Sequence, residues 1–214
     1  MASSPAPARS RTKAPTIPAA WKDHVDHILI SEDQIRTRVS QLAAEISRDF
    51  SGHETVVLAV LNGTVLFLAD LLRQLAFPMR LDFVGVSSYG KGTTSGDLVF
   101  TRPTSIDVRG RDVLIVDDIL DTGKTLDRVT TLVRQFKPRR VRTCVLLDKK
   151  ARRQIKIKGD YTGFQIPDEF VVGYGLDFAE RYRNLPFIAV LKPEIYHPND
   201  LPAPTSPPRR SAKA

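Results

Sequence analysis

The segment that most constrains the fold runs from residue 112 to 126 and reads Asp-Val-Leu-Ile-Val-Asp-Asp-Ile-Leu-Asp-Thr-Gly-Lys-Thr-Leu. Its β-branched, apolar start predicts a short strand buried on both faces, as in a parallel sheet covered by helices. We expect that strand to end where Asp117 and Asp118 begin, which would place both acids at the carboxyl edge of the sheet. The Thr-Gly-Lys-Thr turn that follows predicts a helix start, whose free N–H groups and dipole suit a phosphate.

This segment also allows two other interpretations. Gly123, Lys124 and Thr125 match the end of a nucleotide P-loop. The first glycine of that motif would fall at Asp118, however, and a carboxylate there would repel a polyphosphate. An acidic turn without chemistry would explain the strand and the turn but not three acids followed by a phosphate-type loop, because clustered acids are costly without ligands. The segment therefore favours a site for a phosphorylated sugar.

An apolar strand, two acids, two apolar residues and Asp-Thr-Gly-Lys-Thr together resemble the signature of the type I phosphoribosyltransferases. The resemblance implies a 5-phosphoribosyl-1-pyrophosphate site in which Asp117 and Asp118 face the ribose hydroxyls and Mg²⁺. Many relatives carry Glu first in this pair, so the shorter Asp117 reduces its reach by one methylene. The resemblance also implies that the 5′-phosphate is held by Asp121, Thr122, Gly123, Lys124 and Thr125.

Length and composition predict one compact domain. The 214 residues are 42% hydrophobic and 26% charged, which is sufficient for a core without covalent cross-links. Cys144 is the only cysteine, so we expect no intrachain disulfide and a reducing compartment. No apolar run approaches the roughly 18 residues of a membrane span, and the N-terminus lacks a secretory signal. We therefore expect a cytoplasmic protein with no membrane partner.

The formal net charge of +8 is concentrated in the two ends of the chain. Residues 1–20 and 201–214 contain no acid and are rich in Pro, Ala and Ser, which predicts disordered tails around a phosphoribosyltransferase domain at 21–200. An organelle transit peptide is also basic and acid-free, but four prolines in the first 18 residues disfavour its amphipathic helix. The basic residues of the tails are Arg9, Arg11, Lys13, Arg209, Arg210 and Lys213.

Strand and helix patterns alternate between residues 21 and 200. Ser31 and Gln34 form a capping-box pattern before a predicted helix. Its apolar face comprises Ile35, Val39, Leu42 and Ile46. Strands are predicted at 55–61, 81–86, 112–116 and 141–147, and further helices at 65–75 and about 125–136. The predicted fold is α/β, an open parallel sheet flanked by helices, whose ligands bind beyond the carboxyl ends of the strands.

Leu61-Asn62-Gly63-Thr64 follows one of these strands at the same predicted edge. In the resembling family this loop binds pyrophosphate through backbone amides, often with a cis peptide bond that does not involve proline. Lys is common where Asn62 stands; a backbone role would survive that change, although a positive charge near the leaving group is lost. The alternative is an ordinary Asn-Gly turn, and the sequence leaves the isomer of the Leu61–Asn62 bond open.

Ser88 and Tyr89 precede a polar, glycine-rich stretch at 90–96, which predicts a mobile loop. A long solvated hairpin would have the same composition. Relatives close a corresponding Ser-Tyr loop over the reacting groups, which would exclude water from a ribosyl cation-like transition state.

The last third of the chain indicates the substrate class. Its Phe-Val-Val-Gly-Tyr-Gly-Leu-Asp run at 170–177 resembles the purine hood of hypoxanthine-guanine phosphoribosyltransferases, and implies a small hood built from about 21–30 and 149–195. By resemblance, Phe170 stacks on the base, the Val171 backbone reads its edge, Asp177 holds a second Mg²⁺, and Arg183 contacts pyrophosphate together with Asn62 and Gly63. Lys149 aligns with a lysine that donates to a purine 6-oxo group, so adenine should be rejected. Taken one at a time, residues 170–174 also fit an ordinary strand, and Arg183 also fits a surface charge.

The activity implied is transfer of a 5-phosphoribosyl group from phosphoribosyl pyrophosphate to N9 of hypoxanthine or guanine, with Mg²⁺ as cofactor. The products would be IMP or GMP and pyrophosphate. We expect Asp121, in the loop beneath the ribose, to be the general base for the purine proton. Relatives are dimers or tetramers, so a homodimer or homotetramer is expected.

The sequence also allows three other classes of function. A nucleic-acid-binding regulator on the same fold could use the Arg and Lys residues between 134 and 158, although a solvated charged face and no nucleic-acid partner are the expectation. A purine enzyme that prefers xanthine is a second alternative. A metal site at His24 and His27 is a third, but two histidines without further ligands are usually surface residues.

Overall fold

The computed structural model describes residues 16–88, 98–102 and 104–197. The tails predicted at 1–20 and 201–214 lie outside these residues except for 16–20, and so does Tyr89 of the predicted mobile loop. Ser88, the other residue of that prediction, ends a strand. Within the described part of the chain, no helix combines the length and apolar character needed to cross a membrane.

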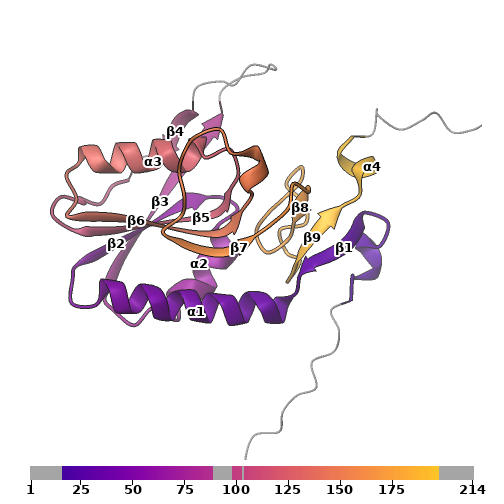
Figure 1. Cartoon of the computed structure of the whole chain (residues 1–214), viewed down its shortest axis with the longest axis horizontal. Helices are drawn as coiled ribbons and strands as arrows, with labels where there is room; N and C mark the ends of the chain where they lie inside the picture. The colour runs from indigo at the N-terminus through magenta and orange to yellow at the C-terminus, as the bar shows by residue number, and fades with distance from the viewer. Residues whose placement is uncertain (1–15, 89–97, 103, 198–214) are drawn as a thin grey trace, which may run out of the picture.

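A six-stranded sheet forms the centre of the molecule (Figure 1). Its order is β4-β3-β2-β5-β6-β7, and all neighbouring strands run parallel except β3 and β4. The strands are β2 (Thr55–Leu61), β3 (Met79–Ser88), β4 (Leu98–Arg102), β5 (Asp112–Leu120), β6 (Arg140–Asp148) and β7 (Tyr161–Gln165). The predicted open parallel α/β fold is confirmed, with an antiparallel edge strand added to it.

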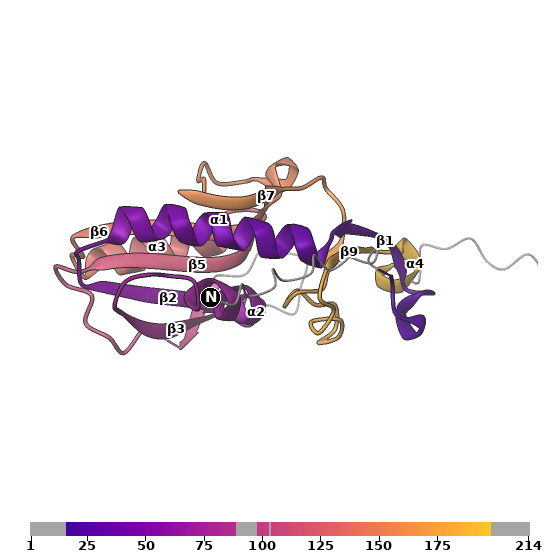
Figure 2. The same cartoon turned by 90° about the horizontal axis from the view of Figure 1, so that it is seen from below.

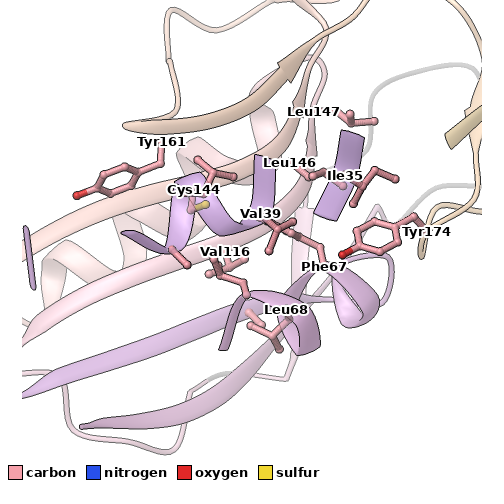
Figure 3. Packing of buried hydrophobic residues seen from close by; sticks show 14 of the residues in the cluster. Ile35, Val39, Phe67, Leu68, Val116, Cys144, Leu146, Leu147, Tyr161 and Tyr174 are labelled. Atoms are coloured by element: carbon pink, nitrogen blue, oxygen red, sulfur yellow. The ribbon is translucent and has the colours of Figure 1, made fainter. Parts of the chain in front are cut away.

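Helices cover both faces of this sheet (Figure 1). The helices α1 (Glu32–Phe50) and α2 (Val65–Leu72) pack on one face, where Val57 and Ala59 of β2 join their core. The helix α3 (Lys124–Gln135) packs on the other face with Val56 and Leu58. This alternation along β2 is the period of two that a strand buried on both faces requires. Figure 3 shows the first of these cores around Val39, Phe67 and Val116.

The start of α1 follows the predicted capping box. Ser31 Oγ accepts a hydrogen bond from the Gln34 amide (3.3 Å), and Gln34 Oε1 accepts one from the Ser31 amide (2.8 Å). Two donors that a helix start leaves without partners are thereby satisfied. Ile35, Val39, Leu42 and Ile46 are all buried, as the helical periodicity predicts.

A smaller antiparallel sheet lies beyond the carboxyl ends of the main strands (Figures 1 and 2). Its order is β1-β9-β8, from β1 (Val25–Ile30), β9 (Ile188–Leu191) and β8 (Val171–Val172). The 3₁₀ helix η1 (Ala19–Trp21) and the short helix α4 (Pro193–Tyr196) flank it. We call these five elements, with the turns at 173–187, the hood. Its separate apolar core includes Val25, Val172, Tyr182, Leu185 and Phe187.

Three predicted boundaries need correction. The central strand does not end at Val116; β5 continues through both acids to Leu120, because its pairing with β6 continues to Asp148. The second helix ends at Leu72 rather than 75, since the amides of Gln74 and Leu75 each bond a carbonyl three residues back. The hood is not continuous from 149 to 195, because β7 and the 3₁₀ helix η2 (Lys150–Arg152) belong to the main sheet and its loops.

Candidate active site

A cavity of about 520 Å³ lies between the carboxyl edge of the main sheet and the hood. Residues of the loops that follow β2, β5 and β6 line this cavity, as the parallel arrangement of the strands predicts. Thirteen of the predicted site residues line it: Asn62, Gly63, Asp117, Asp118, Asp121, Thr122, Gly123, Thr125, Lys149, Phe170, Val171, Asp177 and Arg183. Lys124, the first residue of α3, is not among its lining residues. Arg152 and Leu176 also line the cavity and were missed by sequence reasoning.

The acidic pair lies inside β5 at the floor of this cavity. Asp117 is 5% exposed, and its Oδ1 accepts a hydrogen bond from the Asp118 amide (3.0 Å). Burial, together with the nearby charge of Asp118, raises the pKa of Asp117 well above its usual value. Burial likewise raises the pKa of Asp118. Two oxygen-rich groups that resist ionisation side by side are the type of donor set that a hard cation stabilises.

The loop after β5 leads directly into the amino end of α3. Gly123 occupies the N-cap position with φ +88°, a left-handed conformation that favours glycine. A Cβ there would also lie 2.8 Å from Ile157 Cγ2, so both backbone and space require glycine. Thr122 Oγ1 accepts a long hydrogen bond from the Lys124 amide (3.4 Å). The positive end of the α3 dipole therefore faces the cavity beside the acidic pair.

Asp121 stands between the acidic pair and this helix start. Its Oδ2 lies 3.6 Å from Nη1 of Arg152, a partly exposed side chain of η2. Its Oδ1 is enclosed and accepts no hydrogen bond from the residues that the structure describes. A buried acceptor without a partner is unfavourable unless a ligand supplies the donor. Asp121 therefore lines the cavity, with one of its two carboxylate oxygens enclosed and without a hydrogen-bond donor among the described residues.

The loop after β2 contacts both the acidic pair and the hood. The Leu61–Asn62 peptide bond, whose isomer the sequence left open, is cis. Gly63 packs against Asp118 on one side and against Gly175 of the hood on the other. A Cβ on Gly175 would lie only 1.9 Å from the Gly63 carbonyl oxygen, so the hood backbone touches this loop directly.

Arg183 and Asp177 enter the cavity from the hood. Their side chains form an ion pair, with Arg183 Nη2 3.0 Å from Asp177 Oδ1. Arg183 Nη1 also donates to the Gly175 carbonyl (2.9 Å), and its Nη2 lies 2.8 Å from Glu180 Oε2. The Glu180 amide donates to Asp177 Oδ2 (2.9 Å). The guanidinium is therefore oriented by three partners at the edge of the cavity.

The opposite end of the cavity is lined by Lys149 and an aromatic group. Lys149 is 5% exposed, and its Nζ donates to the Glu169 carbonyl (2.6 Å) and lies 3.7 Å from Asp168 Oδ1. The Phe170 ring stacks on Tyr196 with centroids 4.6 Å apart and meets Phe178 edge to face at 5.5 Å. Tyr196 was missed because nothing in its local sequence indicates contact with a residue 26 positions earlier.

The alternative sites proposed from sequence are arranged differently. His24 Nδ1 hydrogen-bonds the Tyr182 hydroxyl (2.8 Å), whereas His27 pairs with Asp26 (2.7 Å). Among residues 16–88, 98–102 and 104–197, no three His, Cys, Asp or Glu side chains form a metal-binding group. Part of the basic run between 134 and 158 forms ion pairs: Arg139 and Arg140 with Asp112, Arg142 with Asp160, and Arg153 with Asp148.

Comparison with known proteins agrees with this geometry. Residues 30–179 match the phosphoribosyl transferase domain, and the chain belongs to that family. Within this family, the chain is similar to proteins named hypoxanthine or hypoxanthine-guanine phosphoribosyltransferase. It is 43% identical over 176 residues to the hypoxanthine-guanine phosphoribosyltransferase of Bacillus subtilis, covering 82% of this chain and 98% of that protein.

Two further relatives extend the comparison. The crystal structure of a hypoxanthine phosphoribosyltransferase from Staphylococcus aureus has a TM-score of 0.80 and 38% identity, over 85% of this chain and 99% of that one. The Bifunctional protein TilS/HprT of Listeria monocytogenes is 45% identical over 173 residues, or 80% of this chain. The chain spans only 27% of the length of that bifunctional protein.

Proposed function

We propose that the protein transfers the 5-phosphoribosyl group of phosphoribosyl pyrophosphate to N9 of hypoxanthine or guanine, releasing pyrophosphate. The observation that carries the proposal is one cavity in which a buried acidic pair, a helix start and a lysine beside an aromatic ring converge. These are complementary to the sugar hydroxyls, the 5′-phosphate and a 6-oxopurine, respectively. The names of the similar enzymes support the same activity.

The sugar phosphate is assigned to the β5–α3 loop. The amides at the start of α3 have no helical partners, so they can donate to the 5′-phosphate oxygens while the helix dipole favours its charge. The hydroxyls of Thr122 and Thr125, which line the cavity, add neutral donors.

The purine is assigned to the space beside Phe170 and Lys149. Tyr196 stacks on the Phe170 ring, and Phe170 lines the cavity, where its ring can receive an aromatic base. Lys149 has three donor hydrogens, and the Glu169 carbonyl accepts one. A purine 6-oxo group can accept a second Lys149 hydrogen, whereas the 6-amino group of adenine cannot. Adenine would therefore leave one donor hydrogen of this buried ammonium without an acceptor.

The donor set of the cavity fits Mg²⁺, which prefers carboxylate oxygens and substrate phosphates. Asp117 and Asp118 would hold the ion at the ribose hydroxyls, and Asp177 would hold a second ion at the pyrophosphate. When bound, Mg²⁺ neutralises the charge that develops on the departing pyrophosphate. Burial raises the pKa values of Asp117 and Asp118, and a bound cation would oppose this effect by favouring their ionised forms.

Side chains and backbone groups of the protein bind the leaving pyrophosphate and accept the purine proton. Arg183 donates to the pyrophosphate as negative charge accumulates there, and Gly63 offers its backbone on the same side. The Asp121 carboxylate, which lines the cavity, accepts the purine proton while N9 forms its bond to the sugar and pyrophosphate leaves. The hood residues Val171, Leu176, Asp177 and Arg183 line one side of the cavity, where they would limit access of water to the ribosyl cation-like transition state.

The test of this proposal is a substrate panel. Purified full-length protein is mixed with phosphoribosyl pyrophosphate, Mg²⁺ and either hypoxanthine, guanine, xanthine or adenine, and nucleotide formation is followed. We expect turnover with hypoxanthine or guanine and none with adenine. Faster turnover with xanthine would favour the alternative specificity, and absence of any turnover would refute the proposal.

A substitution of Asp121 tests its proton-accepting role separately. Asp121→Asn should lower kcat by about 10²-fold or more, the usual scale for a lost acid-base group, with little change in thermal unfolding. Asp33→Asn, which alters an exposed aspartate on α1, is the matched control. Normal turnover in Asp121→Asn would remove this residue from the mechanism.

We further propose a cytoplasmic homodimer or homotetramer, as the family resemblance implies. Light scattering coupled to size-exclusion chromatography would determine the number of chains.

A further inference from the structure

The phosphate loop (121–125) and the residue before it are hydrogen-bonded to residues on both sides of η2. Three consecutive carbonyls, those of Leu120, Asp121 and Thr122, all accept hydrogen bonds from these residues. The donors to Leu120 are the Lys149 amide (3.0 Å) and Arg153 Nη2 (3.0 Å). Asp121 accepts from Arg153 Nε (2.8 Å), and Thr122 accepts from the amides of Gln154 (2.9 Å) and Ile155 (3.1 Å).

These bonds determine where the loop amides point. In a trans peptide, the carbonyl of one residue and the N–H of the next lie in one plane and point in opposite directions. Carbonyls 120, 121 and 122 directed at the 153–155 segment therefore turn the N–H groups of Asp121, Thr122 and Gly123 the other way. That direction is the cavity, which all three residues line. The loop is thus preorganised to donate to an anion.

Arg153 is the side chain that joins these contacts. Its guanidinium binds the carbonyls of Leu120, Asp121 and Ile157 and forms an ion pair with Asp148, the last residue of β6. Its side chain is 16% exposed. Its Cδ lies 3.1 Å from the position of a Cβ on Gly123, so the stem packs beneath the glycine turn. Arg153 is not among the residues that line the cavity.

We propose that Arg153 is a positioning residue, which holds the phosphate loop (121–125) in its anion-binding conformation without touching the substrate. The inference rests on the proposed function. It predicts that Arg153 acts selectively on the binding of phosphoribosyl pyrophosphate, because the Lys149 side chain at the purine end of the cavity is oriented by the Glu169 carbonyl and not by Arg153. A planar fork with several fixed donors suits this task better than an ammonium group.

The test compares three variants by steady-state kinetics. Arg153→Met retains the packed stem and removes all guanidinium bonds, and Arg153→Lys restores only the charge. Arg38→Met is the matched control: Arg38 is 25% exposed, donates to the Thr162 (2.8 Å) and Gly163 (3.1 Å) carbonyls and pairs with Glu45, away from the cavity. Both Met variants therefore lose comparable backbone bonds and one ion pair.

We expect Arg153→Met to lower kcat/KM for phosphoribosyl pyrophosphate by about 10²-fold, the cost of a misplaced binding loop. KM for hypoxanthine should remain near the wild-type value, and Arg153→Lys should be intermediate. Inorganic phosphate, tested as an inhibitor competing with phosphoribosyl pyrophosphate, should bind Arg153→Met more weakly. Arg38→Met should reproduce the loss of thermal stability without these kinetic effects.

An equal rise in both KM values, or the same kinetic loss in Arg38→Met, would overturn the positioning role and leave only a structural one. So would unchanged kinetics in Arg153→Met while the wild-type protein is active. Failure of the proposed function is distinguishable, because the wild-type protein itself would then show no turnover with the substrate panel.

Discussion

A Cβ atom on Gly63 would lie 1.7 Å from Oδ2 of Asp118 and 2.8 Å from its Cγ. The loop after β2 and the acidic pair in β5 are therefore in direct contact, with no space for a methyl group between them. Two parts of the site that are 55 residues apart in sequence share one boundary.

Gly63→Ala should consequently displace Asp118 or the loop itself. Because placement errors of about 1 Å can cost about 10²-fold in rate, we expect at least that loss in kcat/KM for phosphoribosyl pyrophosphate. Gly52→Ala is the control: a Cβ there meets nothing within 4 Å, although its φ of +81° makes the change cost roughly 1 kcal/mol of stability. If Gly63→Ala retains wild-type kinetics, the close contact is not needed for the site.

Asp117→Asn should make the folded protein more stable while abolishing its activity. Burial raises the pKa of Asp117, so its ionised form at neutral pH is less favourable in the folded chain than in the unfolded one. A neutral amide removes that cost, and each 1 kcal/mol gained would raise Tm by about 2–4 °C in a chain of this size. Thermal unfolding at pH 7 without ligands measures the gain, with Asp33→Asn as the exposed control. A lower Tm in Asp117→Asn would contradict the assignment of an unfavourable buried charge.

The strongest sequence signals were those whose physics is local. The apolar run at 113–116, the capping box at Ser31 and the glycine at 123 each follow from bonds or conformations within a few residues, and the structure contains all three. The parallel sheet follows from the same pattern, because strands joined by helices favour parallel neighbours, but the sequence analysis predicted no strand order. Placing Asp117 and Asp118 after the strand was wrong for the opposite reason. Pairing with β6, a long-range interaction, extends β5 through both polar residues.

The missed residues are those that contribute through distant contacts. Tyr161–Gln165 is a five-residue strand with two polar side chains, and only its pairing with β6 identifies it as the edge of the sheet. Arg152 and Arg153 read as part of a solvated basic run, yet one lies beside Asp121 and the other binds three carbonyls and Asp148. Residue type and spacing do not encode which surface arginine turns inward.

Asp82→Asn should destabilise the protein at neutral pH and have a smaller effect in acid. Burial opposes ionisation of Asp82, but hydrogen bonds from Ser105, Phe83 and Thr104 outweigh it and lower the pKa of this carboxyl. A depressed pKa stabilises the fold at pH values above the ordinary Asp range, and this contribution is lost as the pH falls through that range. We expect a loss of about 1.5–3 kcal/mol at pH 7, since the amide has a single acceptor oxygen for these donors.

Urea unfolding of Asp82→Asn and wild type at pH 7 and near pH 3.5 measures this difference. Asp107→Asn is the control, because Asp107 is exposed and accepts one hydrogen bond from the Arg109 amide (3.0 Å). A difference between Asp82→Asn and wild type that stays constant over this range would show that the charge of Asp82 is not the source of its contribution.

Tyr196→Leu should weaken purine binding without affecting phosphoribosyl pyrophosphate. Tyr196 stacks on Phe170 at 4.6 Å with an interplanar angle of 19°, so it fixes the ring that we propose receives the base. Aromatic pairs contribute about 0.5–1.5 kcal/mol beyond their buried area, which corresponds to a rise of roughly twofold to tenfold in KM for hypoxanthine. Tyr196→Phe preserves the stack and should behave like wild type. Initial rates with each substrate varied in turn separate the two KM values, and a change in both would mean that α4 supports the whole hood rather than the base-binding ring.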